Sequence, residues 1–191
     1  MAKERFFAVL GDDDFLVRQR AKEIFDEHLS QFPDDLSREQ IDGRAEKVED
    51  VERILKDART SGQTLSLFGG GKLVWISEAN FINQTRVGAA QGSKDALESI
   101  KSFLGNLGET IVILSACPVH RGHSFVKWLQ KNATYEDVAK QEKEDVAFRR
   151  LVEETAQSCE VNFAPGSLEF LAGKIGSHPR LGVEETKKMA S

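Results

Sequence analysis

The sequence has no apolar run that could cross a membrane and contains few cysteines and prolines. Its 191 residues include 2 cysteines and 4 prolines, and no stretch approaches the roughly 18 consecutive apolar residues of a membrane-spanning helix. The start, Met1 to Arg5, also lacks the apolar region of a signal peptide, so we expect a cytoplasmic protein. Cys117 and Cys159 lie far apart beside apolar segments, which favours buried thiols over a disulfide or a metal site.

An excess of positive charge is absent too. There are 26 Lys and Arg residues against 31 Asp and Glu residues, which gives a formal net charge of −5. This balance argues against a protein that binds nucleic acid by itself. With 40% hydrophobic and 30% charged residues, the composition is that of a globular protein with a real core.

Apolar segments of strand length alternate with amphipathic helical segments through the first 139 residues. Strands are predicted at residues 5–10, 39–42, 72–77, 110–114 and 133–138. Helices are predicted at residues 12–32, 48–60, 93–107 and 125–131. This alternation is typical of an α/β fold with a parallel sheet and helices on both of its faces.

The pattern becomes purely helical after residue 139. A charged stretch at residues 140–145 precedes apolar stripes at residues 146–156 and 168–175, and a last helix follows Pro179. We therefore predict an α/β domain over residues 1–139 and a small three-helix domain over residues 140–191.

The turn after the first strand stands where many α/β proteins bind phosphate, but it lacks the residues for this. A parallel α/β domain followed by a small helical one is the layout of AAA+-type ATPases, in which the first strand leads into G-x-x-x-x-G-K-[ST]. The turn here runs Gly11, Asp12, Asp13, Asp14, Phe15, Leu16, Val17, Arg18. Leu16 replaces the second glycine, Val17 the lysine and Arg18 the hydroxyl residue. Carboxylates repel phosphate by about 1 kcal/mol at 4 Å even in water, so we predict that this loop does not bind ATP.

The three aspartates fit two interpretations. They could cap the following helix, whose positive N-terminus favours acidic side chains, or they could hold a divalent metal. Consecutive residues point in different directions and no distant ligand completes a set, so capping is favoured and no metal or cofactor is expected. The second apolar strand ends in Ser77-Glu78, and Ser77 stands where ATPases carry the aspartate that holds magnesium.

An adjacent apolar pair, Leu67-Phe68, is the most informative feature of the chain. Leu65 and Ser66 precede it, and Gly69, Gly70 and Gly71 follow it. Three glycines do not continue a helix and permit turns with positive φ, so the pair lies on a connection, which normally runs over the surface. Taken alone, the pair is either a plug on the local core or a contact for a partner, and the rarity of exposed apolar patches favours the plug.

Three segments resemble the delta subunit family of the bacterial DNA polymerase III clamp loader. They are the degenerate loop at residues 11–18, the Ser-Leu-Phe signature and its strand at residues 65–76, and the segment at residues 127–133. A weaker similarity at residues 176–189 includes Arg180, Glu185 and Lys188. The middle segment is the most specific.

The resemblance implies an AAA+-like domain, a helical lid, and a collar domain through which loader subunits assemble. The sequence ends in the lid, so the collar is expected to be absent. It further implies a subunit without catalysis that binds the sliding clamp through Leu67 and Phe68 and helps to open the ring, with DNA contacted only indirectly or weakly. On this basis a partner contact is favoured over the plug. The alternatives are an ATP-using enzyme with an atypical phosphate loop, and another loader subunit, which would be expected to carry zinc-binding cysteines.

Other chemically capable residues favour plain structural roles. His120, Arg121 and His123 follow the third confident strand without an acidic cluster nearby, so a solvated loop is favoured over a metal site. Trp75 and Trp128 occupy apolar positions and are expected in the core or half-buried against it.

Overall fold

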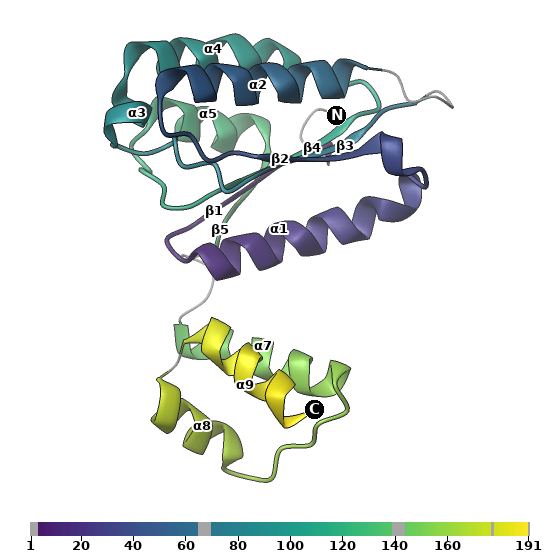
Figure 1. The fold of residues 1–191 in the computed structure, drawn as a ribbon, viewed down its shortest axis with the longest axis vertical. Coiled ribbons are helices and arrows are strands. Elements are labelled where there is room, and N and C mark those ends of the chain that lie inside the picture. The colour runs from purple at the N-terminus through teal and green to yellow at the C-terminus, as the bar shows by residue number, and fades with distance from the viewer. Residues whose placement is uncertain (1–3, 65–69, 139–143, 177, 191) are drawn as a thin grey trace. The chain divides into compact units, whose positions relative to one another are not determined.

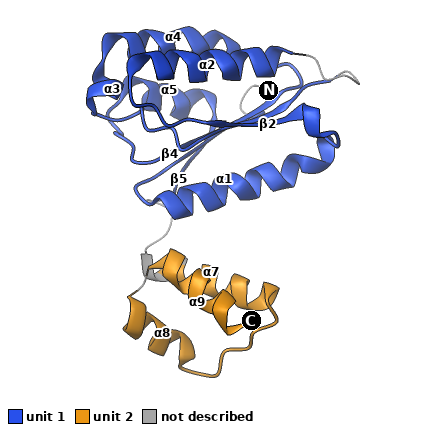
Figure 2. Cartoon of the chain, in the orientation of Figure 1, with its two compact units in different colours: residues 1–138 blue, residues 139–191 orange. Residues whose placement is uncertain are grey.

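The computed structural model describes residues 4–64, 70–138, 144–176 and 178–190 (Figure 1). The chain divides into two compact units, residues 1–138 and 139–191 (Figure 2). Within the described residues, no helix has both the length and the apolar character needed to cross a bilayer.

The first unit is built on a five-stranded parallel sheet. Its strands are β1 (Phe6–Leu10), β2 (Arg38–Asp42), β3 (Leu73–Ser77), β4 (Ile111–Ala116) and β5 (Thr134–Asp137). They pair side by side in the order β2-β3-β4-β1-β5, and each pair is parallel. Every residue of β3 and β4 is buried, as expected for near-continuous apolar strands that are covered on both faces. The predicted α/β fold is confirmed.

Helices cover both faces of this sheet (Figure 1). They are α1 (Asp14–His28), α2 (Val48–Gln63), the short α3 (Arg86–Ala89), α4 (Gln91–Leu104) and α5 (Ser124–Asn132). Helix α1 lies on one face, and α2, α4 and α5 lie on the other. The alternation of strand side chains divides the core accordingly: Ala8 and Leu10 of β1 face the larger helical layer, and Val9 faces α1.

The helices of the first unit differ from the prediction in their ends and in one additional short helix. Helix α1 ends at His28, and the chain continues through a 3-10 turn at Leu29–Gln31 rather than as helix to residue 32. Phe32 is buried against α1 and precedes Pro33, which disfavours helical backbone. Helix α3 was not predicted, because four residues are too few to show a periodic pattern.

The second unit contains α7 (Glu144–Ser158), α8 (Ser167–Ile175) and α9 (Pro179–Met189). Its buried centre consists of Phe148, Val152 and Leu171. Gly182 of α9 lies directly against α7, because a Cβ built on it would lie 2.6 Å from side-chain carbons of both Phe148 and Val152. The glycine therefore permits the close approach of α7 and α9.

We expect Gly182→Val to destabilise this three-helix unit. Overpacking of a filled contact costs about 1–3 kcal/mol, which denaturant unfolding monitored by circular dichroism measures. Gly173→Val on α8 is the matched control, because nothing lies within 4 Å of a Cβ at that position. Equal unfolding free energies for the two variants would contradict the packing described for Gly182.

Candidate functional site

The two regions singled out by the sequence lie at opposite edges of the sheet. The turn at residues 11–18 follows the end of β1, whereas residues 64–72 lead into the start of β3. Since all strands run in the same direction, their last residues share one edge, here called the carboxyl edge, and their first residues share the amino edge. The degenerate loop therefore lies at the carboxyl edge, and the connection that carries Leu67 and Phe68 enters the sheet at the amino edge.

At the carboxyl edge, side chains of the degenerate loop contact other residues of the protein. The Asp13 side chain caps α1 by accepting a hydrogen bond of 2.9 Å from the Leu16 amide, which confirms the predicted capping role. Leu16 and Val17 are buried, and Arg18 forms an ion pair of 3.3 Å with Glu78. The side chains at the positions of the second glycine, the lysine and the hydroxyl residue are thus buried or paired.

Arg121 ties this loop to the last strand. Its guanidinium donates hydrogen bonds of 2.7 and 3.0 Å to the two carboxylate oxygens of Asp137 and one of 2.9 Å to Asp12. Asp137 is only 5% exposed, so Arg121 supplies the cation that a buried carboxylate requires. Hydrogen bonds to Asp137 and then to Asp12 raise the pKa of Arg121 above its ordinary value. The prediction of a solvated loop did not include these pairings of Arg121.

His123 in the same loop also has a structural role. Its Nδ1 accepts a hydrogen bond of 3.2 Å from the Phe125 amide and so caps α5, and burial lowers the pKa of the imidazole. Across the described residues, no group of three or more His, Cys, Asp or Glu side chains could hold a metal ion.

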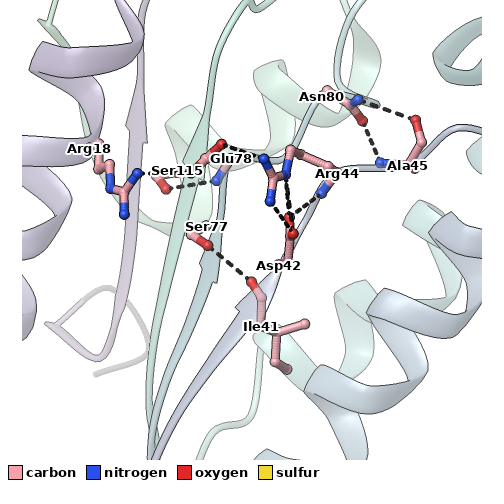
Figure 3. Close-up of polar contacts among 9 residues, drawn as sticks. All are labelled: Arg18, Ile41, Asp42, Arg44, Ala45, Ser77, Glu78, Asn80 and Ser115. Carbon is pink, nitrogen blue, oxygen red and sulfur yellow. Dashed lines mark hydrogen bonds and ion pairs between the residues drawn. The ribbon is translucent and has the colours of Figure 1, made fainter.

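Glu78, which follows β3, lies between Arg18 of α1 and Arg44, which follows β2 (Figure 3). Arg18 approaches one carboxylate oxygen at 3.3 Å, and Arg44, which also pairs with Asp42, approaches the other at 3.8 Å. The backbone of Glu78 has a φ of 56°, a conformation that costs a non-glycine residue about 1 kcal/mol or more. Ser77 beside it donates a hydrogen bond of 3.2 Å to the Ile41 carbonyl. The pair that corresponds to Asp-Glu of an ATPase is thus a serine bonded to backbone and a glutamate held by arginines.

The tryptophans pack as expected, whereas the cysteines are less buried than expected. Trp75 is buried and donates a hydrogen bond of 3.0 Å from Nε1 to Ser115 Oγ, and Trp128 packs partly buried against the core. Both cysteines are free but half-buried rather than fully buried. Burial raises the pKa of Cys117 to about 11, and the neighbouring aspartates add to the effect, so its thiol is protonated at neutral pH.

At the amino edge, Leu65, Ser66, Leu67, Phe68 and Gly69 lie outside the described residues. The residues on either side of them are described. Helix α2 ends at Gln63, and the Thr64 amide bonds to the carbonyls of Thr60 and Ser61.

The glycines that follow are required by backbone geometry. Gly70 has a φ of 90°, in the region that favours glycine. A Cβ on Gly71 would lie 2.2 Å from the carbonyl carbon of Glu109, so only glycine allows this close approach of two backbone segments. The connection therefore returns to the sheet through a fixed turn.

Thr110 holds both ends of this connection. Its buried hydroxyl donates a hydrogen bond of 2.9 Å to the Gly62 carbonyl in the last turn of α2 and accepts one of 3.2 Å from the Lys72 amide just before β3. Lys72 is further fixed because its carbonyl accepts a hydrogen bond of 2.8 Å from the Ile111 amide. Gly62 and Lys72, on either side of the connection, are thus both bonded to Thr110.

Three residues that organise these two edges were not predicted from the sequence. They are Glu78, Thr110 and Arg121, whose pairing with Asp137 and Asp12 was not predicted. A hydroxyl residue directly before an apolar strand was the one available signal for Thr110. For Arg121 and Glu78 no local signal exists, because their partners lie 16 or more residues away along the chain.

A protein family model and a solved structure match this chain. A family model described as "DNA polymerase III, delta subunit" matches residues 7–139. Among solved structures, the chain is similar to the Bacillus subtilis DNA clamp loader delta protein (YqeN), with 17% identity and a TM-score of 0.63. The match covers 98% of this chain and 53% of that structure, so the chain spans about half the length of the protein it resembles. A comparison with curated proteins gives no match.

We expect no binding of ATP, with or without magnesium. The loop after β1 offers no free lysine for the phosphates, and its Asp13 and Arg18 already have partners. Isothermal titration calorimetry at millimolar nucleotide should give only heats of dilution, with a P-loop ATPase as the positive control in the same buffer. A saturable heat would contradict the assignment of this loop as degenerate.

We expect Thr110→Val to loosen the base of the connection at the amino edge. The substitution keeps the side-chain shape but removes the two hydrogen bonds to Gly62 and Lys72, and unsatisfied buried groups cost about 1–3 kcal/mol. Hydrogen exchange should show faster exchange at the Lys72 amide together with a lower unfolding free energy.

The matched control is Thr186→Val, whose buried hydroxyl bonds only to the Gly182 carbonyl of its own helix. Unchanged exchange at Lys72 in the Thr110 variant would show that the threonine does not hold the connection.

Proposed function

Because the chain belongs to the DNA polymerase III delta subunit family, we propose that it is a non-catalytic clamp-loader subunit that binds the sliding clamp and helps to open the ring. The observation that carries this proposal is the anchored connection between α2 and β3. Its sequence offers Leu67 and Phe68, and Thr110, Gly70 and Gly71 fix the chain on either side of them.

Two adjacent apolar side chains on a fixed base suit a protein partner. Burying both in a partner's pocket contributes roughly 3–6 kcal/mol at the usual value per side chain. A pair of this size can dominate an interface as a hot spot. Since the ends of the connection are already ordered, less conformational entropy is lost when the pair binds.

Ring opening then follows from differential binding and requires no chemistry in this subunit. A protein that binds the opened form of the clamp more tightly than the closed form shifts the equilibrium by its difference in affinity. The paired and buried residues of the degenerate loop support a subunit that leaves ATP hydrolysis to others.

The remaining partners are the other clamp-loader subunits. We propose that ATP binding in those subunits controls when the amino edge of this chain reaches the clamp. We also propose that this subunit assembles with the other subunits through a collar domain. It contacts DNA only indirectly or weakly. The net charge of −5 supports the last point, because DNA-binding surfaces carry a basic excess.

We expect Leu67→Ala combined with Phe68→Ala to abolish capture of the sliding clamp. The two substitutions remove the apolar surface that would enter the clamp, while the anchors at Thr110 and Gly71 remain. Surface plasmon resonance with immobilised clamp from the same organism measures the loss, and circular dichroism should show folding near wild type.

The matched control is Phe170→Ala, which removes an apolar side chain that is 68% exposed in the second unit. It should bind the clamp like the wild type. Unchanged capture by the double variant would overturn the assignment of Leu67 and Phe68.

A further inference from the structure

Leu36 is the exposed large apolar side chain of the first unit. It is 62% exposed, and the others of this kind among the described residues, Val146, Phe170, Leu181 and Met189, all belong to the second unit. Scattered exposed leucines are ordinary, so exposure alone says little. The structure around Leu36 and its position relative to β3 distinguish it.

The segment that carries Leu36 is a braced turn. The Asp34 side chain accepts a hydrogen bond of 2.8 Å from the Leu36 amide, and the Asp34 carbonyl accepts hydrogen bonds of 2.6 Å and 3.1 Å from the Ser37 hydroxyl and amide. Behind the turn, Arg38 donates hydrogen bonds of 2.6 Å to the Phe32 carbonyl and 3.0 Å to the Pro33 carbonyl.

These contacts hold the backbone of Leu36 in one conformation while its side chain stays in solvent. An apolar side chain on such a base loses little conformational entropy when a partner covers it. Leu36 therefore has the property expected of an interface anchor rather than of a loosely held surface residue.

The register of the sheet places this turn beside the connection before β3. Arg38 pairs with Leu73, so the residues before β2 and those before β3 enter the sheet side by side, at a strand spacing of about 4.8 Å. A cavity of about 770 Å³ lies at this edge, and its walls include Pro33, Asp34 and Ser37 from one segment and Gly70 and Gly71 from the other. The two segments therefore border the same hollow in the surface.

We propose that Leu36 is a second apolar contact for the sliding clamp, on the turn whose Asp34 and Ser37 line this cavity together with Gly70 and Gly71. The inference rests on the proposed function for the identity of the partner. A partner that engages the connection before β3 would come close to the turn before β2, because Gly70 and Gly71 line one cavity with Asp34 and Ser37. Leu36 lies in that turn between the lining residues Asp34 and Ser37, and its side chain is exposed to solvent.

The test measures clamp affinity for Leu36→Ser, for the Leu67→Ala and Phe68→Ala double variant, and for the three changes combined. Leu36→Ser should weaken binding about tenfold, the loss expected for one well-covered apolar contact. The hydrogen bond from the backbone amide of residue 36 to Asp34 is retained, so the melting temperature should match that of the wild type. Met189→Ser, at a side chain that is 55% exposed in the second unit, is the control and should leave affinity unchanged.

A photo-crosslinking residue placed at position 36 gives an independent readout. It should form a crosslink to the clamp, and the same residue at position 189 should not. The absence of a crosslink from position 36, or an affinity of Leu36→Ser equal to that of Met189→Ser, overturns the inference. So does a loss of self-association in Leu36→Ser without a loss of clamp binding, which would assign the surface to a second copy of this chain.

Failure of the proposed function has a different signature. In that case the wild-type chain does not bind the clamp, or the double variant binds as well as the wild type. If the double variant loses binding while Leu36→Ser keeps it, the proposed function stands and only the role of Leu36 is wrong.

Discussion

The parallel pairing of β1 with β4 and β5, and of β3 with β2 and β4, sends all strands in one direction. Each return therefore requires a helix that crosses a face of the sheet, and the turns before and after the strands are separated by the full strand length. This constraint puts the degenerate loop at one edge and the anchored connection at the other. A change in one region can then occur without direct contact with the other.

At the carboxyl edge, arginines pair with the carboxylates at the ends of the strands and in the turn after β1. Arg121, Arg18 and Arg44 take up the carboxylates of Asp137, Asp12, Glu78 and Asp42. Most of these pairs are exposed and contribute little to stability individually. The pair of Arg121 with Asp137 differs because that carboxylate is buried, so loss of the arginine would leave an uncompensated charge.

The parts of this fold that were predictable from sequence are those with a local cause. Strands β3 and β4 were predictable as apolar runs because both of their faces are covered. The three aspartates at residues 12–14 indicated the start of α1 to within two residues. The roles of Thr110 and Arg121 had to come from the structure, because their contacts join residues 16 to 109 positions apart. Leu36 gave no signal, since a single exposed leucine is unremarkable until the neighbouring strand is known.

The double anchoring by Thr110 also bears on how this protein could be redesigned. One buried hydroxyl bonds both to the last turn of α2 and to the residue before β3. The residues in between could therefore change in length and composition without a change in the sheet. The entropy lost on closing a loop also rises only slowly with its length. The amino edge is therefore a natural position for grafting foreign peptides, which would be displayed from a rigid frame.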